Sequence, residues 1–270
     1  MSLVVNTNVA SLNAQRSLSA SSNELKTAME RLSSGKKINS AADDAAGFAI
    51  AERMTAQIRG LNMATKNAND GLSMLAVIEN ATNDVTDMLQ RMRELAIQAA
   101  NDTNGSADRG FLQSEVSQLI QEIDRVATQT QYNGETILNG SFTDKKIQVG
   151  TESGQTVGFS VSSITSTDLG VNTIDVSSDP SAALSAITSA IEDVAGDRAS
   201  YGALQNRLEY TVSNLMNVAE FTTSARSRIE DADFAAESAR LAKAQVLQQT
   251  GTAMLAQANV SPKLALSLIK

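Results

Sequence analysis

The side chains of this chain that could carry out acid–base chemistry are two groups of carboxylates. Asp43 and Asp44 stand next to each other, and Glu230, Asp231 and Asp233 follow much later in the chain. Carboxylate pairs can act as general acid and base, usually beside a histidine, a nucleophile or a phosphate-binding loop. The sequence has no histidine and no cysteine. Both groups stand where helices are expected to begin, so we expect them to stabilise helix dipoles rather than to catalyse a reaction.

The stretch NDTNGSADRGFLQ is a candidate metal site, because Asp102, Asn104 and Ser106 alternate oxygen ligands as a calcium loop does. An EF-hand loop would require glycine at the position of Ala107 and glutamate at that of Gln113. The stretch therefore predicts a turn between two helices. Without histidine or cysteine the common zinc sites are also excluded, and we expect no catalytic residue, no metal and no cofactor.

The composition favours long, slender helices. Of 270 residues 42% are hydrophobic, but only 3% are aromatic, and the two prolines are Pro180 and Pro262. Cores of alanine and leucine suit closely packed helices, and long stretches lack the strongest helix breaker. No segment has the roughly 20 uninterrupted apolar residues of a membrane helix. The start, MSLVVNTNVASLNAQR, lacks the cationic region of a Sec-type signal peptide.

Charge is distributed unevenly along the chain. The net charge of −8 divides into +3 over residues 1–40, −13 over 41–225 and +2 over 226–270. An acidic middle region is typical of a solvent-facing surface. A nucleic-acid groove would need clustered Lys and Arg with stacking aromatic residues, so we expect neither a nucleic-acid nor a membrane partner.

Apolar residues at spacings of three and four predict helices along most of the chain. The first stripe ends at Gly35, and the second runs from Met54 to Ala99, long enough for about 80 Å of helix if continuous. Helical spacing returns in 112–126 and again after Pro180. The stretch 131–179 contains two Asn-Gly pairs and alternating residues, which predict a β-hairpin and a polar loop. The predicted fold class is mainly α: an elongated helical bundle or coiled coil with a small β-hairpin region.

The last thirty residues, 241–270, contain three lysines and no acid. Their apolar face is too large for a free terminus, and one partner helix cannot cover it. We therefore expect the two chain ends to pair and further copies of the protein to cover the remainder. The residues predicted to form the core and subunit contacts of this terminal coiled coil are Leu18, Leu25, Leu32, Leu247, Met254 and Leu255.

The segment QRMRELA, residues 90–96, permits two interpretations. Arg91 and Glu94 could form charge pairs on a solvated helix face, or the same face could bind a partner. The residues alone do not decide between them.

The chain resembles bacterial flagellins. RLSSGKKINSAADDAAGFAIAERMTAQIRGLNMATKNANDGLSM, residues 31–74, is similar to the amino-terminal signature of that family, and SRIEDADFAAESARLAKAQVLQQTGTAMLAQAN, residues 227–259, is similar to the carboxy-terminal one. QRMRELAIQAAN and EIDRVATQTQYNG extend the match. The resemblance implies a structural, non-enzymatic subunit that polymerises into the flagellar filament, is secreted through the flagellar export channel and functions outside the cell.

The resemblance also implies a domain organisation. Residues 1–40 and 226–270 would form the two halves of an inner coiled coil. Residues 41–139 and 180–225 would form a helical rod domain, with the hairpin and loop in 140–179. Many flagellins insert large outer domains here, and this chain has no room for them, which implies a thin, smooth filament.

Implied partners are other copies of the chain, an export chaperone at the carboxy-terminal segment, and the filament cap and junction proteins. Vertebrate Toll-like receptor 5 recognises the surface of many flagellins that matches Arg91, Leu95 and Glu115 here. Two alternatives to a filament subunit stay open: a hook-filament junction protein, or a discrete coiled-coil adaptor.

Overall fold

The computed structural model describes residues 7–267, and side chains for residues 7–261. The chain divides into two compact units. Unit 1 comprises Met1–Ala56 and Phe221–Lys270, and unit 2 comprises Gln57–Glu220. The mainly α class with small β-hairpins is confirmed by the element order. The predicted halves of the inner coiled coil, 1–40 and 226–270, fall inside unit 1, and their boundaries stay a prediction.

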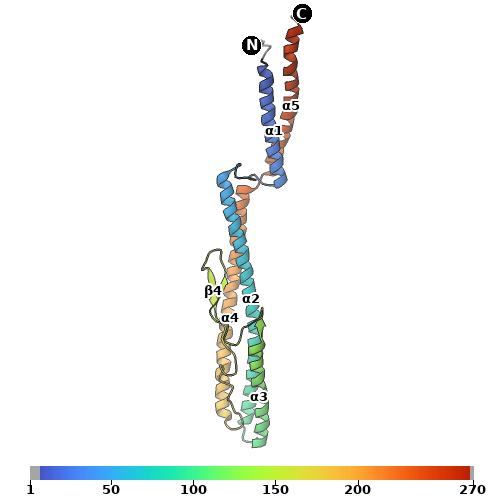
Figure 1. Ribbon diagram of the computed structural model, residues 1–270. Coiled ribbons are helices and arrows are strands. Elements are labelled where there is room, and N and C mark those ends of the chain that lie inside the picture. Colours follow the sequence, from blue (N-terminus) through green and yellow to red (C-terminus); the bar gives the residue numbers. More distant parts are fainter. Residues whose placement is uncertain (1–6, 268–270) are drawn as a thin grey trace. The chain divides into compact units, whose positions relative to one another are not determined.

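In unit 1, helices α1 (Val9–Ser34) and α5 (Phe234–Ser267) lie side by side (Figure 1). The Asn8 side chain begins α1 by accepting a hydrogen bond from the Ser11 N–H at 3.1 Å. Gly35, at φ 72°, ends the helix in the left-handed conformation, as the sequence predicts. The pairing is antiparallel, because Asn8 donates to the Ala258 carbonyl at 2.7 Å while Arg31 pairs with Glu237 at 3.6 Å.

The seam between α1 and α5 mixes small side chains with leucines. On each helix, residues at alternating spacings of three and four are buried or half-buried. They are Ser11, Ala14, Leu18, Ser21, Leu25, Ala28 and Leu32 on α1, and Glu237, Leu241, Ala244, Gln248, Gly251, Leu255 and Ala258 on α5. A Cβ on Gly251 would lie 3.3 Å from Leu18 Cδ1. The two backbones run within 8 Å of each other, Cα to Cα, because small residues recur along the seam between the larger ones.

Unit 2 has a continuous apolar core. Helices α2 (Ala45–Ala99) and α4 (Pro180–Glu230) enter it from unit 1, and α3 (Ser106–Gln129) returns along α2 after a turn (Figure 1). The Asp108 carboxylate accepts the Gly105 N–H at 3.2 Å at the start of α3. The fully buried core side chains include Leu75, Ile78, Val85, Leu89, Met92, Ile123, Ile187 and Leu208.

The stretch between α3 and α4 contains two hairpins rather than one. β1 (Gln131–Tyr132) pairs antiparallel with β2 (Glu135–Thr136), and β3 (Lys145–Gln148) pairs antiparallel with β4 (Thr156–Phe159). Asn133 (φ 52°) and Gly134 (φ 83°) form the two-residue turn of the first hairpin, which requires positive φ at both positions.

The β3–β4 hairpin lies on α2 over a row of residues with little bulk. A Cβ on Gly60 would lie 2.7 Å from Thr151 Cγ2, and one on Gly71 would overlap the end of Ile147. Between these glycines, Asn67 donates a hydrogen bond to the Gln148 carbonyl at 3.1 Å. The absence of side chains at the two glycines therefore permits this close approach.

The Ser/Thr-rich loop after β4 is not the plain polar loop that its composition predicts. It buries six apolar side chains: Val161, Ile164, Leu169, Val171, Ile174 and Val176. Side chains of the helices hold its backbone, since Asp124 accepts the Ser166 N–H at 2.8 Å and Gln113 accepts the Val176 N–H at 2.8 Å. The loop closes the core of unit 2.

Candidate functional site

The face of α5 turned away from α1 carries an apolar stripe that no other described element covers. Val246, Ala253 and Val260 recur every seven residues on it, and Leu247 and Met254 stand next to them. Met254 is 66% exposed and Leu247 is 40% exposed. Between Ala244 and Ser261 the helix has no charged residue. The polar residues beside the apolar stripe are therefore all uncharged.

The six residues predicted for the terminal coiled coil separate into two groups. Leu18, Leu25, Leu32 and Leu255 are half-buried in the seam between α1 and α5. Leu247 and Met254 lie outside that seam, so within one chain they are not core residues. Sequence spacing placed them one position out of register, because Gln248 and Leu255, rather than Leu247 and Met254, face α1. Contact with a second copy remains the prediction for Leu247 and Met254.

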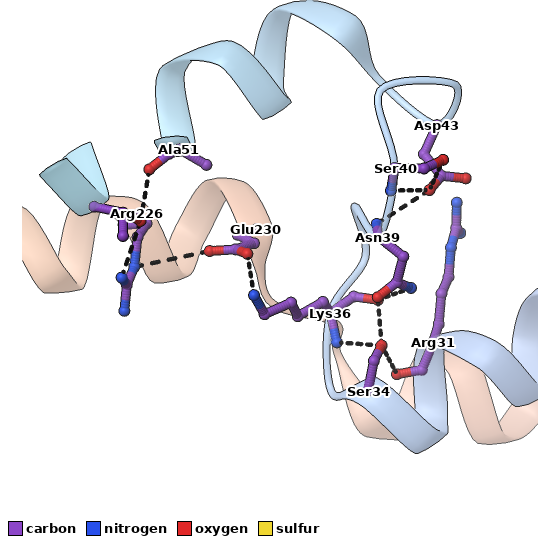
Figure 2. A network of polar contacts seen from close by, with 10 residues as sticks. Arg31, Ser34, Lys36, Asn39, Ser40, Asp43, Ala51, Arg226 and Glu230 are labelled. Carbon is purple, nitrogen blue, oxygen red and sulfur yellow. Dashed lines mark hydrogen bonds and ion pairs between the residues drawn. The ribbon is translucent and has the colours of Figure 1, made fainter. Parts of the chain in front are cut away.

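A polar network fastens the base of the terminal coil, where the loop after α1 meets the junction between α4 and α5 (Figure 2). Lys36 pairs with Glu230 at 2.5 Å, and Arg226 pairs with the same carboxylate at 3.8 Å. The backbones join as well, since the Lys37 N–H donates to the Glu230 carbonyl at 2.7 Å and the Ala232 N–H donates to the Gly35 carbonyl at 2.9 Å. The two segments are therefore held together by main-chain and side-chain bonds.

Arg226 extends this network to α2. Its Nη1 donates to Thr55 Oγ1 at 3.2 Å, and the Thr55 hydroxyl donates in turn to the Ala51 carbonyl at 2.9 Å. The side chain of Glu230 is 15% exposed. This largely buried carboxylate, with its two cationic partners, links the loop after α1 to the end of α4.

Two of the acidic residues with candidate chemistry act at helix starts, and a third, Asp43, holds the loop before α2. Asp44 accepts the Gly47 N–H at 2.9 Å in the first turn of α2, and Asp233 accepts the Ala235 N–H at 2.9 Å in that of α5. Asp43 accepts the N–H groups of Ser40 and Asn39, which hold the pKa of its carboxyl below the ordinary value. The expected stabilising role is confirmed for Asp44 and Asp233.

The same expectation is wrong for the other two acids. Glu230 is the last residue of α4, and Asp231 forms an isolated β-bridge with Lys36. Glu230 therefore ends α4, and Asp231 lies in the short link before α5, which begins at Phe234.

On unit 2, Arg91 and Glu115 form an exposed charge pair between α2 and α3. Arg91 Nε and Nη2 donate to one Glu115 oxygen at 2.9 and 2.8 Å, and Nη1 donates to Glu94 at 3.0 Å. The hydrogen bonds that Arg91 donates to Glu115 and, second, to Glu94 raise the pKa of its guanidinium. Leu95, which the sequence placed on this surface, is 1% exposed. It faces the core, because it continues the buried stripe of α2.

The turn from Asn101 to Gly110 binds itself rather than offering ligands to a metal. Asn101 accepts the Thr103 N–H at 3.2 Å, and Asn104 donates to the Gln98 carbonyl at 2.6 Å. Among residues 7–267, no group of three or more acidic side chains lies close enough to hold an ion. In the same range, no helix is both long and apolar enough to cross a membrane.

Two family models match the helical parts of the chain. The bacterial flagellin N-terminal helical region matches residues 5–143, and the bacterial flagellin C-terminal helical region matches residues 184–269. The chain belongs to the bacterial flagellin family. Members of this family are structural proteins that build the flagellar filament outside the cell, and this chain is a subunit of such a filament.

Full-length relatives agree with that assignment. A flagellin of Halalkalibacterium halodurans is 40% identical over 99% of this chain and 100% of its own length. A flagellin of Xenorhabdus nematophila is 41% identical over the whole of both chains. A flagellar filament 33 kDa core protein of Treponema phagedenis is 40% identical over 99% of this chain and 100% of its own.

Solved structures show the same architecture. The crystal structure of Bacillus cereus flagellin superposes with a TM-score of 0.51 at 30% identity, covering 56% of this chain and 88% of that one. A Vibrio parahaemolyticus protein described as flagellar hook-associated superposes with a TM-score of 0.59 over 70% of this chain and 100% of its own. At 16% identity the second likeness shows a shared fold alone.

Proposed function

We propose that copies of this flagellin join in the filament through the outer stripe of α5, with Leu247 and Met254 at the centre of the contact. The supporting observation is that this face is apolar and exposed, whereas the face toward α1 is already covered. Burying both side chains between copies removes apolar surface from water, which drives association. The stripe repeats along the helix, so each copy offers a contact of extended length.

Growth from filament fragments tests this contact. Wild-type monomer added to sheared filaments should elongate them, as followed by light scattering and electron microscopy. Changing Leu247 and Met254 together to glutamate should abolish elongation, because two carboxylates would have to be desolvated at the contact. The matched control is Gln245→Glu, an exposed position of α5 beside the α1 seam, which should elongate nearly as well as wild type.

Removal of Val246–Lys270 should leave a soluble protein in which unit 2 remains folded and elongation is lost. Normal filaments from that truncated chain, or from the double glutamate variant, would show that the outer stripe of α5 is not the contact. Long growing particles would also exclude the discrete coiled-coil adaptor, since an adaptor forms one small oligomer at every concentration.

Further partners are part of the proposal. We infer that an export chaperone covers the carboxy-terminal segment before assembly, since its stripe is otherwise open to water, and that cap and junction proteins meet the ends of the filament. A junction protein would occupy only a short zone, and full-length identity of about 40% to flagellins favours the filament subunit. Immunogold labelling along the whole filament is the expected result.

We also infer that Arg91 and Glu115 form a contact surface for Toll-like receptor 5. Support comes from the exposure of the pair and its two hydrogen bonds, whereas Leu95 is buried in the core. Arg91→Ala with Glu115→Ala in monomeric protein should weaken receptor signalling at least about tenfold. Exposed Arg125, which pairs with Glu122 on α3, offers the control Arg125→Ala. An unchanged response of the double variant would refute the receptor contact.

A further inference from the structure

A hollow of about 450 Å³ opens beside the seam of the terminal coil, toward the end where α1 finishes and α5 begins. Its lining carries three cationic side chains, Arg31, Arg240 and Lys243, and two carboxylates, Glu24 and Glu237. The remaining lining residues, Asn23, Thr27 and Ala28, are uncharged. Because all of them belong to α1 and α5, the hollow is a feature of unit 1 alone, and its lining has one positive charge in excess.

The two carboxylates do not satisfy the cations. Glu237, with a side chain 7% exposed, accepts a hydrogen bond from Arg240 at 3.1 Å and lies 3.6 Å from Arg31. Arg31 Nε is buried and makes no hydrogen bond to any described residue. Lys243 is exposed and forms no ion pair within the described chain, although Glu24 lies across the hollow from it. Asp43, in the loop after α1, also lies close enough to Arg31 for their charges to interact, so Lys243 is the cation of the hollow that lacks an ion-pair partner among the described residues.

The hollow continues the assembly face of α5. Arg240 stands seven residues before Leu247 and fourteen before Met254, so all three share one side of the helix. Lys243 stands in the same way before Thr250 and Gln257. A second copy that covered the apolar stripe would therefore also pass over this hollow, and interfaces commonly surround an apolar centre with charged groups.

We propose that the hollow lined by Arg31, Arg240 and Lys243 receives a carboxylate side chain of a second copy of this flagellin. Such a group gives Lys243 the partner that it lacks within the described chain and offsets the excess charge of the lining. This inference rests on the proposed contact through α5 and assigns its polar part: the apolar stripe gives adhesion, and the ion pair gives the register in which copies meet.

Carbodiimide cross-linking tests the inference directly, because this reagent joins a carboxylate to a lysine amine with loss of water only where the two touch. Filaments are grown from an equal mixture of ¹⁵N-labelled and unlabelled protein, cross-linked and digested. Mass spectrometry should find Lys243 peptides joined to an acidic peptide of the other isotope. Lys243 joined only to Glu24 of the same isotope would overturn the proposal.

Charge reversal gives the second readout. Lys243→Glu should raise the critical concentration for elongation roughly tenfold or more, since the carboxylate of the second copy would meet a like charge. The control Arg16→Glu reverses an exposed charge of α1 away from the hollow. It should change the critical concentration less than about twofold. Equal behaviour of the two variants would overturn the proposal.

The outcomes separate this inference from the function on which it rests. If wild-type protein elongates and Leu247→Glu with Met254→Glu does not, the α5 contact stands, whatever Lys243→Glu does. If phosphate replaces chloride at constant ionic strength and alters growth, while no mixed-isotope cross-link forms, a solution anion occupies the hollow and the proposal of a second copy fails.

Discussion

The terminal coil of unit 1 and the helical core of unit 2 hold their helices together with different side chains. Between α1 and α5 half of the seam residues are Ala, Ser or Gly and five are half-buried leucines, and the backbones run within 8 Å of each other. In the described chain, α2, α3 and α4 keep no such closeness, because Leu, Ile and Met fill the space between them. Unit 2 therefore has a core of its own, whereas the coil buries little apolar surface until other copies cover it.

The largest effect is expected in the core of unit 2. Leu89→Ala should lower the free energy of unfolding by about 2–5 kcal/mol, because Leu89 is fully buried and the change leaves a cavity. Leu25→Ala, in the half-buried seam of the coil, should lower the free energy of unfolding of the monomer much less. Urea unfolding followed by circular dichroism measures both. Equal losses would mean that the coil is as well packed as the core, contrary to the comparison.

A second test concerns the contact between α2 and the β3–β4 hairpin. Gly71→Ala should lower the free energy of unfolding by about 1–3 kcal/mol, because the new methyl group would meet Ile147. Gly202→Ala, inside α4 with open space around it, should instead raise stability by about 0.5–1 kcal/mol through helix propensity. If thermal unfolding showed both variants to be stabilised, the hairpin would not depend on the bare surface of Gly71.

A third test enlarges the seam of the coil. Ala244→Leu should force α1 and α5 apart and weaken their pairing by about 1 kcal/mol, since Ala244 is 1% exposed in a seam of small residues. Amide hydrogen exchange should accelerate about fivefold in these two helices and remain unchanged in α3. Slower exchange in α1 and α5 would show that the seam gains from bulk, and would remove the distinction between the two units.

The smallest effect concerns pH and the loop before α4. Hydrogen bonds from Ser177 and Ser178 lower the pKa of Asp175 to about 2. Because the pKa is lower in the folded state, the ionised carboxyl stabilises the fold at pH values above its unfolded pKa near 3.8. This stabilisation is lost as the pH falls toward 2. Asp175→Asn should therefore flatten a slight loss of stability between pH 4 and pH 2, with little change at pH 7. An unaltered pH profile would contradict this role.

Much of the fold follows from local pattern. The stop at Gly35, the turn at 101–110 and the Asn133–Gly134 hairpin each depend on a few neighbouring residues whose conformational preferences agree, so the sequence predicts them well. The side of α5 that faces α1 was harder to predict. Apolar spacing favoured Leu247 and Met254, but the pairing half-buries the neighbouring Gln248 and Leu255, because close approach of the backbones outweighs the hydrophobicity of single residues.

The sequence alone determined the mainly helical class, the paired ends, the absence of histidine and cysteine chemistry and the likeness to flagellins, because these properties reside in residue types and short-range spacing. Only the tertiary structure decided that Leu95 lies in the core, that a Ser/Thr-rich loop closes unit 2, and that Arg31 has a buried donor without an acceptor. Each of these depends on groups far apart in the chain, whose packing and hydrogen bonds exist only after the helices have met.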